Sequence, residues 1–378
     1  MKIYLVGGAV RDEMLGLPVK ERDYVVVNAT VEDMLKLGYQ QVGKEFPVFL
    51  HPKTREEYAL ARMERKVKPG YKGFTFDTST TVTLEEDLLR RDLTINAMAK
   101  TIPDGVIIDP YHGEQDLKDK ILRHVSPAFV EDPVRILRVG RFWARYAHLG
   151  FRVHDDTIAL MRKMVESGEV DALVAERVWK EWERALGEKH PEKFFELLTL
   201  CGAIEILFPE FGSNYSGIFS LIAAAKITNE PMIRFAALLH ALPDSQKNLK
   251  SICNRYRVPN AYRELALLTA RHYESAKNAQ SLTAQELLNL FSALDIYRRP
   301  DRFKHFLLAC QSIANAQRQS FDDRHWLGLE KAANIAAKCD IKDVLAQGLE
   351  GNALAKAIQD KRKDKVQEWL AKQKPTLL

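Results

Sequence analysis

Two carboxylates separated by one residue, Glu21 and Asp23, are the side chains that point most directly to chemistry. They precede an apolar run, Tyr24-Val25-Val26-Val27, that predicts a β-strand. Alternation along a strand would place both carboxylates on one face, where they repel each other unless a divalent cation lies between them. Carboxylates at this spacing suit Mg2+, which leaves its remaining positions for phosphates. On its own, such a pair is more often the solvated start of an ordinary strand.

A glycine turn precedes the two carboxylates and could hold a phosphate. Gly7 and Gly8 follow a predicted strand, Ile3–Val6, and a helix is predicted to begin there. Adjacent glycines let the backbone approach a ligand closely, and the free N–H groups of a helix start favour an anion. Arg11 would add a charge that can donate to two phosphate oxygens. A Gly-Gly pair alone is more often a simple turn, so the prediction rests on the order of these features.

Two later segments place charged residues at helical spacing. Thr83 and Glu86 form a capping box that predicts a helix over the residues that follow. That helix would carry Asp87, Arg90, Arg91 and Asp92. These charges could be no more than ion pairs on a solvated helix face.

Asp132 and Pro133 are typical of a helix start, with the carboxylate as N-cap and proline at the first helical position. A capping Asp needs no function, but Arg135 follows three residues later, so both side chains can face one small volume. The same side of the predicted helix continues with Arg138, Arg141 and Arg145. Aromatic residues among these arginines indicate a packed face, so we favour phosphate contacts over a solvated stripe.

Taken together, these motifs resemble those of a known family. Gly7-Gly8-Ala9-Val10-Arg11-Asp12, Glu21-x-Asp23, Arg90-Arg91-Asp92 and Glu131-Asp132-Pro133-Val134-Arg135, in this order, are similar to the signature of class II tRNA nucleotidyltransferases, the CCA-adding enzymes. The bacterial type with a C-terminal HD domain is the most similar, from Met1 to about Phe211. Many members have Asp where this chain has Glu21, and the longer carboxylate can still reach a metal ion.

The resemblance implies template-independent addition of C, C and A to the 3′ end of tRNA, from CTP and ATP, with release of pyrophosphate. Glu21 and Asp23 would be the catalytic carboxylates and the Mg2+ ligands in a two-metal mechanism. Nucleotide binding would fall to Gly8, Arg11, Arg91, Asp92, Asp132, Arg135, Arg138 and Arg141. A poly(A) polymerase or an A-adding enzyme on the same head stays an alternative, as does a noncatalytic tRNA-binding protein. The partner would be tRNA and not DNA, and the chain a monomer or a homodimer.

Base selection by Asp132 and Arg135 has a chemical rationale. Cytosine and adenine both present an amino donor beside a ring-nitrogen acceptor, so a carboxylate and a guanidinium fit both bases. Uracil and guanine present a carbonyl and a ring N–H instead, and mispaired buried polar groups are costly. In the resembled enzymes this pair replaces a nucleic-acid template.

Length and composition predict a cytoplasmic protein with several compact units. A chain of 378 residues exceeds one typical core, and its net charge of +5 suits a polyanionic partner without requiring one. The four cysteines have no metal-ligand spacing, and no signal peptide or membrane-spanning run is evident. We expect an α+β protein: a nucleotidyltransferase head with a polymerase-β-like palm and a mixed sheet over residues 1–120, a helical neck over 121–202, and a helical body and tail over 203–378.

The C-terminal half departs from the resembled type. The adjacent His-Asp pair of an HD domain is missing, because Ala241 follows His240, which we interpret as a core or surface residue. A last helix, from about Ala353 to Lys372, carries a basic face that is more typical of a solvated surface than of a tRNA contact. In the N-terminal region, Glu57 could be a third active-site acid, although an edge-strand Glu is commoner. A mobile loop is predicted over residues 66–73.

Overall fold

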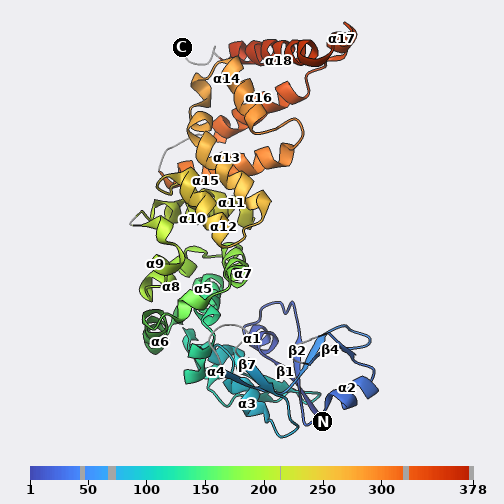
Figure 1. Ribbon diagram of the computed structural model, residues 1–378, viewed down its shortest axis with the longest axis vertical. Coiled ribbons are helices and arrows are strands. Elements are labelled where there is room, and N and C mark those ends of the chain that lie inside the picture. The colour runs from blue at the N-terminus through green and yellow to red at the C-terminus, as the bar shows by residue number, and fades with distance from the viewer. Residues whose placement is uncertain (43–46, 67–73, 213, 318–322, 374–378) are drawn as a thin grey trace. The chain divides into compact units, whose positions relative to one another are not determined.

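The structure is a computed structural model that describes residues 1–42, 47–66, 74–212, 214–317 and 323–373 (Figure 1). The chain forms two compact units, Met1–Pro209 and Glu210–Leu378. The predicted head and neck thus fall in the first unit, and the division between them at residue 120 stays a prediction. Most of the predicted loop, residues 67–73, lies outside the described residues. Among the residues described, no helix is both long and apolar enough to cross a membrane.

A seven-stranded sheet forms the base of the first unit (Figure 1). Its spatial order is β3-β4-β5-β2-β1-β8-β9, with β2 and β5 parallel and the other neighbours antiparallel. The strands are β1 Lys2–Val6, β2 Asp23–Val27, β3 Gln40–Gln41, β4 Val48–Leu50, β5 Glu57–Leu60, β8 Ala99–Thr101 and β9 Ile107–Ile108. Two separate strand pairs are β6 Met63–Lys66 with β7 Phe74–Asp77, and β10 Ile121–Leu122 with β11 Arg152–Val153. This mixed sheet and the helices that follow it confirm the predicted α+β class.

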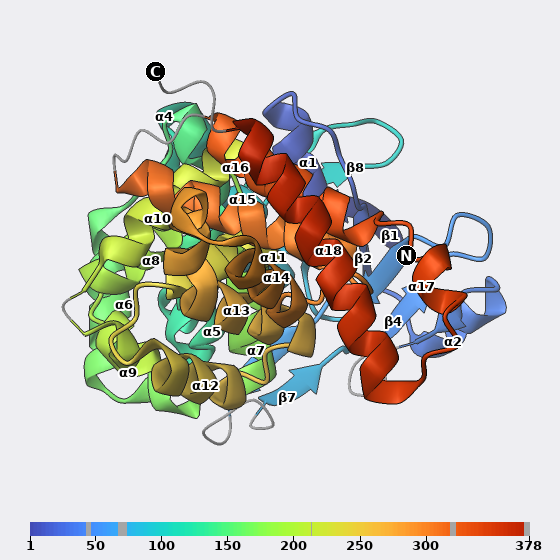
Figure 2. The same ribbon diagram turned by 90° about the horizontal axis from the view of Figure 1, so that it is seen from above.

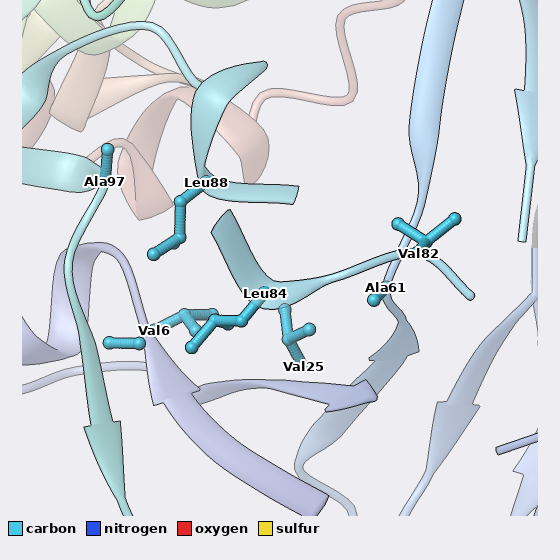
Figure 3. Packing of buried hydrophobic residues seen from close by; sticks show 8 residues of the cluster. Val6, Val25, Ala61, Val82, Leu84, Leu88 and Ala97 are labelled. Atoms are coloured by element: carbon cyan, nitrogen blue, oxygen red, sulfur yellow. The ribbon is translucent and has the colours of Figure 1, made fainter. Parts of the chain in front are cut away.

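Alternating side chains of β2 bury both faces of the sheet. Val25 packs on one face with Leu84 and Leu88 of α3, in the cluster that Figure 3 shows. Val26 packs on the opposite face with Met34 of α2. Because side chains alternate along a strand, Asp23 shares the face of Val25 and projects on the α3 side of the sheet. Burial of both faces fixes the register of β2, and with it the position of Asp23.

The first helices of this unit lie among the strands of the sheet in sequence. The later helices, from α4 onward, follow the last strand of the sheet. They are α1 Gly8–Met14, α2 Val31–Lys36, α3 Leu84–Leu89, α4 Gly113–Asp119, α5 Val134–Tyr146, α6 Asp155–Glu166, α7 Ala175–Leu186, α8 Glu192–Leu200 and α9 Ile204–Leu207. The 3-10 turns are η2 Thr94–Asn96, η3 Pro127–Glu131, η4 Ala147–Leu149, η5 Glu169–Ala172 and, at the boundary of the units, η6 Pro209–Phe211. A capping box begins α3 at Thr83, as predicted, and another begins α2 at Thr30. Helix α5 packs against both α7 and α8, so its polar side is held in one orientation.

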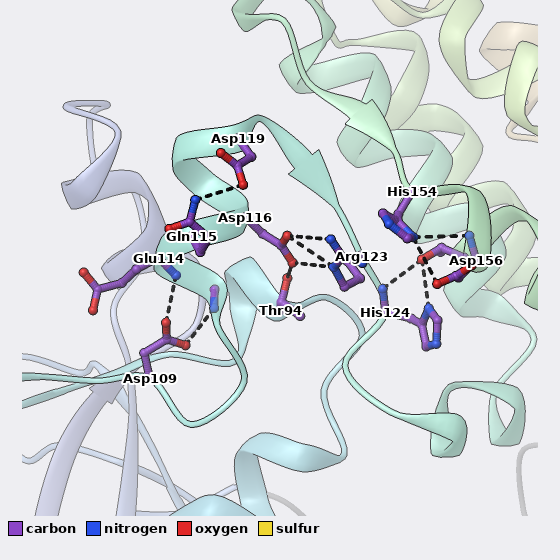
Figure 4. Close-up of polar contacts among 12 residues, drawn as sticks. Thr94, Asp109, Glu114, Gln115, Asp116, Asp119, Arg123, His124, His154 and Asp156 are labelled. Carbon is purple, nitrogen blue, oxygen red and sulfur yellow. Dashed lines mark hydrogen bonds and ion pairs between the residues drawn. The ribbon is translucent and has the colours of Figure 1, made fainter.

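A polar network ties the sheet to the helices that follow it (Figure 4). Asp116 of α4 accepts hydrogen bonds from Thr94 Oγ1 at 2.7 Å and from Arg123 Nε at 3.0 Å. Asp109 accepts from the backbone N–H groups of Gly113 and Glu114, at 2.8 and 2.9 Å, and so satisfies the start of α4. These bonds anchor η2, which carries a residue of the site described below.

The regular elements within the described residues of the second unit are all helices. Its helices are α10 Ser216–Ile227, α11 Pro231–Leu239, α12 Ser245–Arg255, α13 Asn260–Lys277, α14 Ala284–Ala293, α15 Pro300–Ala316, α16 Asp323–Ala337, α17 Lys342–Leu345 and α18 Gly351–Gln373, with the 3-10 turn η7 Ala279–Ser281. The long α18 lies across α14 and α16 (Figure 2). His240 follows α11, half-buried, with Nδ1 2.7 Å from the carbonyl oxygen of Ala237. In the described residues, His, Cys, Asp and Glu form no group of three that could hold a metal ion.

Candidate active site

The turn between β1 and α1 lies directly beside the two catalytic candidates. In the antiparallel pair of β1 and β2, Val6 is opposite Asp23, so the chain turns at Gly7 next to that carboxylate. Gly7 has φ +69°, and a Cβ there would lie 2.7 Å from Arg91 Nη1. Only glycine combines this backbone conformation with this approach. Gly7, which is absent from our predicted site residues, therefore shapes the site together with Gly8.

Asp23 and Glu21 line the same cavity but do not share a strand. Strand β2 begins at Asp23, so the prediction that strand alternation aligns the two carboxylates is wrong. Glu21 instead precedes the strand in irregular backbone. Burial raises the pKa of Asp23, the Arg91 guanidinium opposes this shift, and the negative charge of Glu21 adds to it. Two mutually repelling oxygen ligands of this kind fit a hard divalent cation. Glu57 is opposite Asp23 in the parallel pair of β2 and β5.

Arg11 belongs to a buried network that joins α1 to α5. Its Nε donates to Asp12 Oδ1 at 2.9 Å, and its Nη1 donates to Asn96 Oδ1. Asp12 also accepts from Tyr146 OH at 2.9 Å and from Arg145 Nη2 at 3.3 Å. The Arg11 guanidinium lies over the Tyr146 ring at 5.2 Å. Sequence reasoning missed Asp12 and Tyr146, because their partners are far away along the chain.

The Arg90-Arg91-Asp92 segment lies beyond the helix predicted to carry it. Helix α3 ends at Leu89, so that prediction is wrong for these three residues. Both arginines donate to Asp87, from Arg90 Nη2 at 2.7 Å and from Arg91 Nη2 at 3.2 Å. Asp92 accepts from the backbone N–H of Leu93, a bond that helical backbone would not offer. The chain therefore leaves the helix and turns both arginines toward the cavity.

Asp92 is buried and strongly held as an anion. Arg138 Nε donates to it at 2.7 Å, and Asn96 Nδ2 donates at 2.9 Å. Burial alone would raise the pKa of Asp92, but the charge of Arg138 and the hydrogen bond from Asn96 outweigh burial and hold that pKa well below its usual range. Asp92 thus fixes Arg138 at the cavity wall.

Asp132 and Arg135 both line the cavity, and the backbone N–H of Arg135 donates to the carbonyl oxygen of Asp132 at 3.0 Å. Asp132 accepts two hydrogen bonds from Arg177, at 3.0 and 2.7 Å, and one from the Val134 N–H at 3.2 Å. Helix α5 begins at Val134 with Pro133 as its N-cap, so the prediction that Asp132 is the N-cap and Pro133 the first helical residue is wrong by one position. Asp132 still accepts from the first N–H of the helix. Arg135 donates to the carbonyl oxygens of Ala128 and Arg90, at 2.9 and 2.7 Å.

The remaining predicted arginines on α5 also reach the cavity. Arg141 Nε donates to Glu181 Oε2 of α7 at 2.6 Å, and its guanidinium lies 4.4 Å from the centre of the Phe142 ring. Arg177 and Glu181 are thus the residues of α7 that hold the predicted site in place. Nothing in the sequence near Asp132 or Arg141 indicates these partners.

All the predicted site residues line one cavity of about 770 Å3 in the first unit. This volume suits a nucleotide-sized ligand. Cationic side chains outnumber carboxylates in the wall of the cavity, and this excess of positive charge favours binding of a polyanionic ligand. The lining residues that were not predicted as site residues are Gly7, Ala9, Asp12, Lys20, Arg90, Asn96, Phe142, Arg145, Arg177, Arg184, Gly187 and Glu188.

Comparison with known families places this unit among the nucleotidyltransferases. Residues 3–123 match the family described as "Poly A polymerase head domain". Residues 150–214 match the family described as "Probable RNA and SrmB- binding site of polymerase A".

Relatives along the whole chain define the family. A "Multifunctional CCA protein" of Thioalkalivibrio sulfidiphilus is 50% identical, over 96% of this chain and 97% of its own length. A "CCA-adding enzyme" of Pseudomonas putida is 51% identical over the same shares of the two chains. A solved structure described as "tRNA-processing enzyme with CTP" is 26% identical, with a TM-score of 0.68 and coverage of 96% of each chain. The chain therefore belongs to the CCA-adding enzymes, the tRNA nucleotidyltransferases that the sequence motifs resemble.

Proposed function

We propose that this chain adds C, C and A to the 3′ end of tRNA, with CTP and ATP as substrates and pyrophosphate as the product. One observation carries the proposal: a single cavity holds both the carboxylates Glu21 and Asp23 and the candidate base-reading pair Asp132 and Arg135. Two relatives half identical to the chain bear names of CCA-adding proteins, and a similar tRNA-processing enzyme was solved with CTP.

Glu21 and Asp23 are the proposed ligands of Mg2+. Divalent-metal dependence is general among nucleotidyltransferases, and the two carboxylates described above offer the oxygen donors that Mg2+ prefers. When bound, the metal ion would stabilise negative charge on the α-phosphate and the leaving group, and lower the pKa of the attacking hydroxyl. In the transfer, a bond forms between the 3′ oxygen of tRNA and the α-phosphorus, while the bond to the pyrophosphate oxygen breaks.

The phosphates and the sugar would contact the residues around the glycine turn. Gly8 and Arg11 would hold the triphosphate, and Arg91, Arg138 and Arg141 would add positive charge. Asp92 acts through Arg138, whose guanidinium it holds at 2.7 Å. A preorganised guanidinium loses little freedom when the nucleotide binds, so the charge is in place before the reaction begins.

Base selection would fall to Asp132 and Arg135, as their donor and acceptor chemistry suggests. A carboxylate offers about four acceptor positions. Arg177 and the Val134 N–H occupy both positions on Asp132 Oδ1 and one on Oδ2. One position on Oδ2 is left for the amino group of cytosine or adenine. Arg135 Nη1 and Nη2 each donate to a carbonyl oxygen, which orients the guanidinium that would donate to a ring nitrogen of the base.

The proposal also covers the rest of the chain. The head over 1–120 would perform the transfer, the neck over 121–202 would select the base, and the body and tail over 203–378 would bind tRNA. The enzyme would act in the cytoplasm, where its four free cysteines stay reduced.

Stepwise extension of tRNA tests this function. Three transcripts, ending before the first C, before the second C and before the A, are each incubated with labelled CTP alone or ATP alone. We expect CTP to extend only the first two transcripts, and ATP to extend only the third by one nucleotide. Long A tails on all three would identify a poly(A) polymerase, and extension of the third alone would identify an A-adding enzyme. No extension at all would favour a noncatalytic tRNA-binding protein.

A further inference from the structure

The cavity-lining arginines on α5 beyond Arg135 are already engaged by carboxylates. Arg138 pairs with Asp92 at 2.7 Å and Arg141 pairs with Glu181 at 2.6 Å. Arg145 pairs with Asp12 at 3.3 Å. A phosphate that approaches one of these guanidinium groups must share it with its carboxylate, which lowers the gain from each new contact.

Arg184, in the last turn of α7, differs from these arginines. It lines the same cavity, its side chain is exposed, and its guanidinium makes no hydrogen bond or ion pair within the described part of the chain. Glu188 also lines the cavity. Lys20 is likewise without a partner among the described residues, but it directly precedes Glu21 at the carboxylate end of the cavity.

Two ion pairs show where Arg184 lies along the cavity. Arg177 of α7 pairs with Asp132, just before α5, and Glu181 of α7 pairs with Arg141, further along α5. The two helices therefore advance in the same direction along the cavity. Arg184 follows Glu181 by three residues and shares its face of α7. It thus lies toward the end of the cavity that is away from Asp132.

We propose that Arg184 binds the β- and γ-phosphates of the incoming nucleotide, the pair that leaves as pyrophosphate. The inference rests on the proposed function, in which Asp132 and Arg135 hold the base at the opposite end. With the base there, the triphosphate extends toward α1 and the C-terminal ends of α5 and α7. A guanidinium can donate two parallel hydrogen bonds to phosphate oxygens, and Arg184 gives up no ion pair to do so.

Nucleotide binding in the absence of tRNA tests the role of Arg184. The dissociation constants of CTP and CMP are measured for the unmodified protein, Arg184→Ala, Arg184→Lys and Lys180→Ala. Lys180 is a matched control, because it is an exposed cation on the same helix that does not line the cavity. We expect Arg184→Ala to weaken CTP binding about ten- to a hundredfold, as for a lost charged hydrogen bond, and to leave CMP binding unchanged. Arg184→Lys should recover part of the loss, and Lys180→Ala should bind both nucleotides normally.

Other results would overturn the assignment. Normal CTP affinity in Arg184→Ala would show that this guanidinium is only solvated, and an equal loss for CTP and CMP would place it away from the terminal phosphates. Normal CTP affinity together with weakened tRNA affinity would assign Arg184 to a phosphate of the tRNA backbone. A different result would refute the proposed function itself. In that case the unmodified protein would bind neither CTP nor ATP, and both proposals would fail together.

Discussion

Arg177 donates two hydrogen bonds to the carboxylate of Asp132, at 3.0 and 2.7 Å, across 45 positions of sequence. This bidentate contact fixes the plane of the Asp132 carboxylate at the wall of the cavity. The residue proposed to read the base is thus oriented by a different helix, α7. Base selection should therefore depend on Arg177, even though Arg177 lies outside the motif that contains Asp132.

Replacing Arg177 by alanine should narrow the preference for CTP and ATP over UTP and GTP. Without its two donors, Asp132 can rotate away from the amino group of the base, and loss of one oriented hydrogen bond corresponds to about tenfold in selectivity. Competition between nucleotides during single-turnover extension measures this change. Lys180→Ala on the same helix should keep full selectivity. Unchanged selectivity in a folded Arg177→Ala protein would contradict an orienting role.

Removing the carboxylate of Asp23 should abolish incorporation of both nucleotides. Asp23→Asn keeps the shape of the side chain but loses the charged metal ligand, so we expect a rate at least about a thousandfold lower. Glu21→Asp should keep substantial activity, because a carboxylate remains at that position. Chelation of divalent ions should stop the reaction, and added Mg2+ should restore it. Normal turnover by Asp23→Asn would remove Asp23 from the catalytic site.

Tyr146→Phe should destabilise the first unit, because the phenol donates to the buried carboxylate of Asp12. A hydrogen bond to a charged group is worth about 1.5 to 3 kcal/mol of unfolding free energy. Chemical denaturation followed by fluorescence of the first unit would measure this loss. Tyr215→Phe, at an exposed position, serves as the control and should change stability by less than about 0.5 kcal/mol. Equal stability of the two variants would show that the hydrogen bond from Tyr146 to Asp12 contributes nothing to stability.

Binding of tRNA should weaken steeply as salt increases. An enzyme that accepts every tRNA reads backbone shape and charge rather than one sequence, and phosphate contacts release counterions on binding. The dissociation constant of tRNA, measured at several salt concentrations, gives the slope of its logarithm against the logarithm of the salt concentration. A flat dependence would be inconsistent with binding dominated by phosphates.

Local signals predicted much of this structure correctly. The capping box at Thr83 begins a helix where expected, because it is completed within four residues. The end of α3 was missed, because the chain leaves the helix at Leu89 to place Asp92 against Arg138, a residue 46 positions away. Partners of this kind cannot be read from local spacing.

In the candidate site, too, local motifs were predicted correctly and contacts between distant segments were not. Motifs within the chain identified ten of the residues that line the cavity, because each motif lies in one short segment. The contacts of Asp132 with Arg177 and of Arg141 with Glu181 depend on the packing of α7 against α5, which single-sequence patterns do not reveal. Both contacts change the expected chemistry, since they decide which oxygens and which N–H groups are left for a nucleotide.

The central claim is that the protein itself reads the base through Asp132, and competition among the four nucleotides on Asp132 variants tests it most directly. Asp132→Ala should lower CTP and ATP incorporation and reduce their advantage over UTP and GTP about ten- to a hundredfold. Asp132→Ser retains a helix-capping side chain but lacks the carboxylate, so it should fold normally and lose the same selectivity. A stable Asp132→Ser enzyme that still excludes UTP and GTP would show that Asp132 only caps its helix, and would contradict the account.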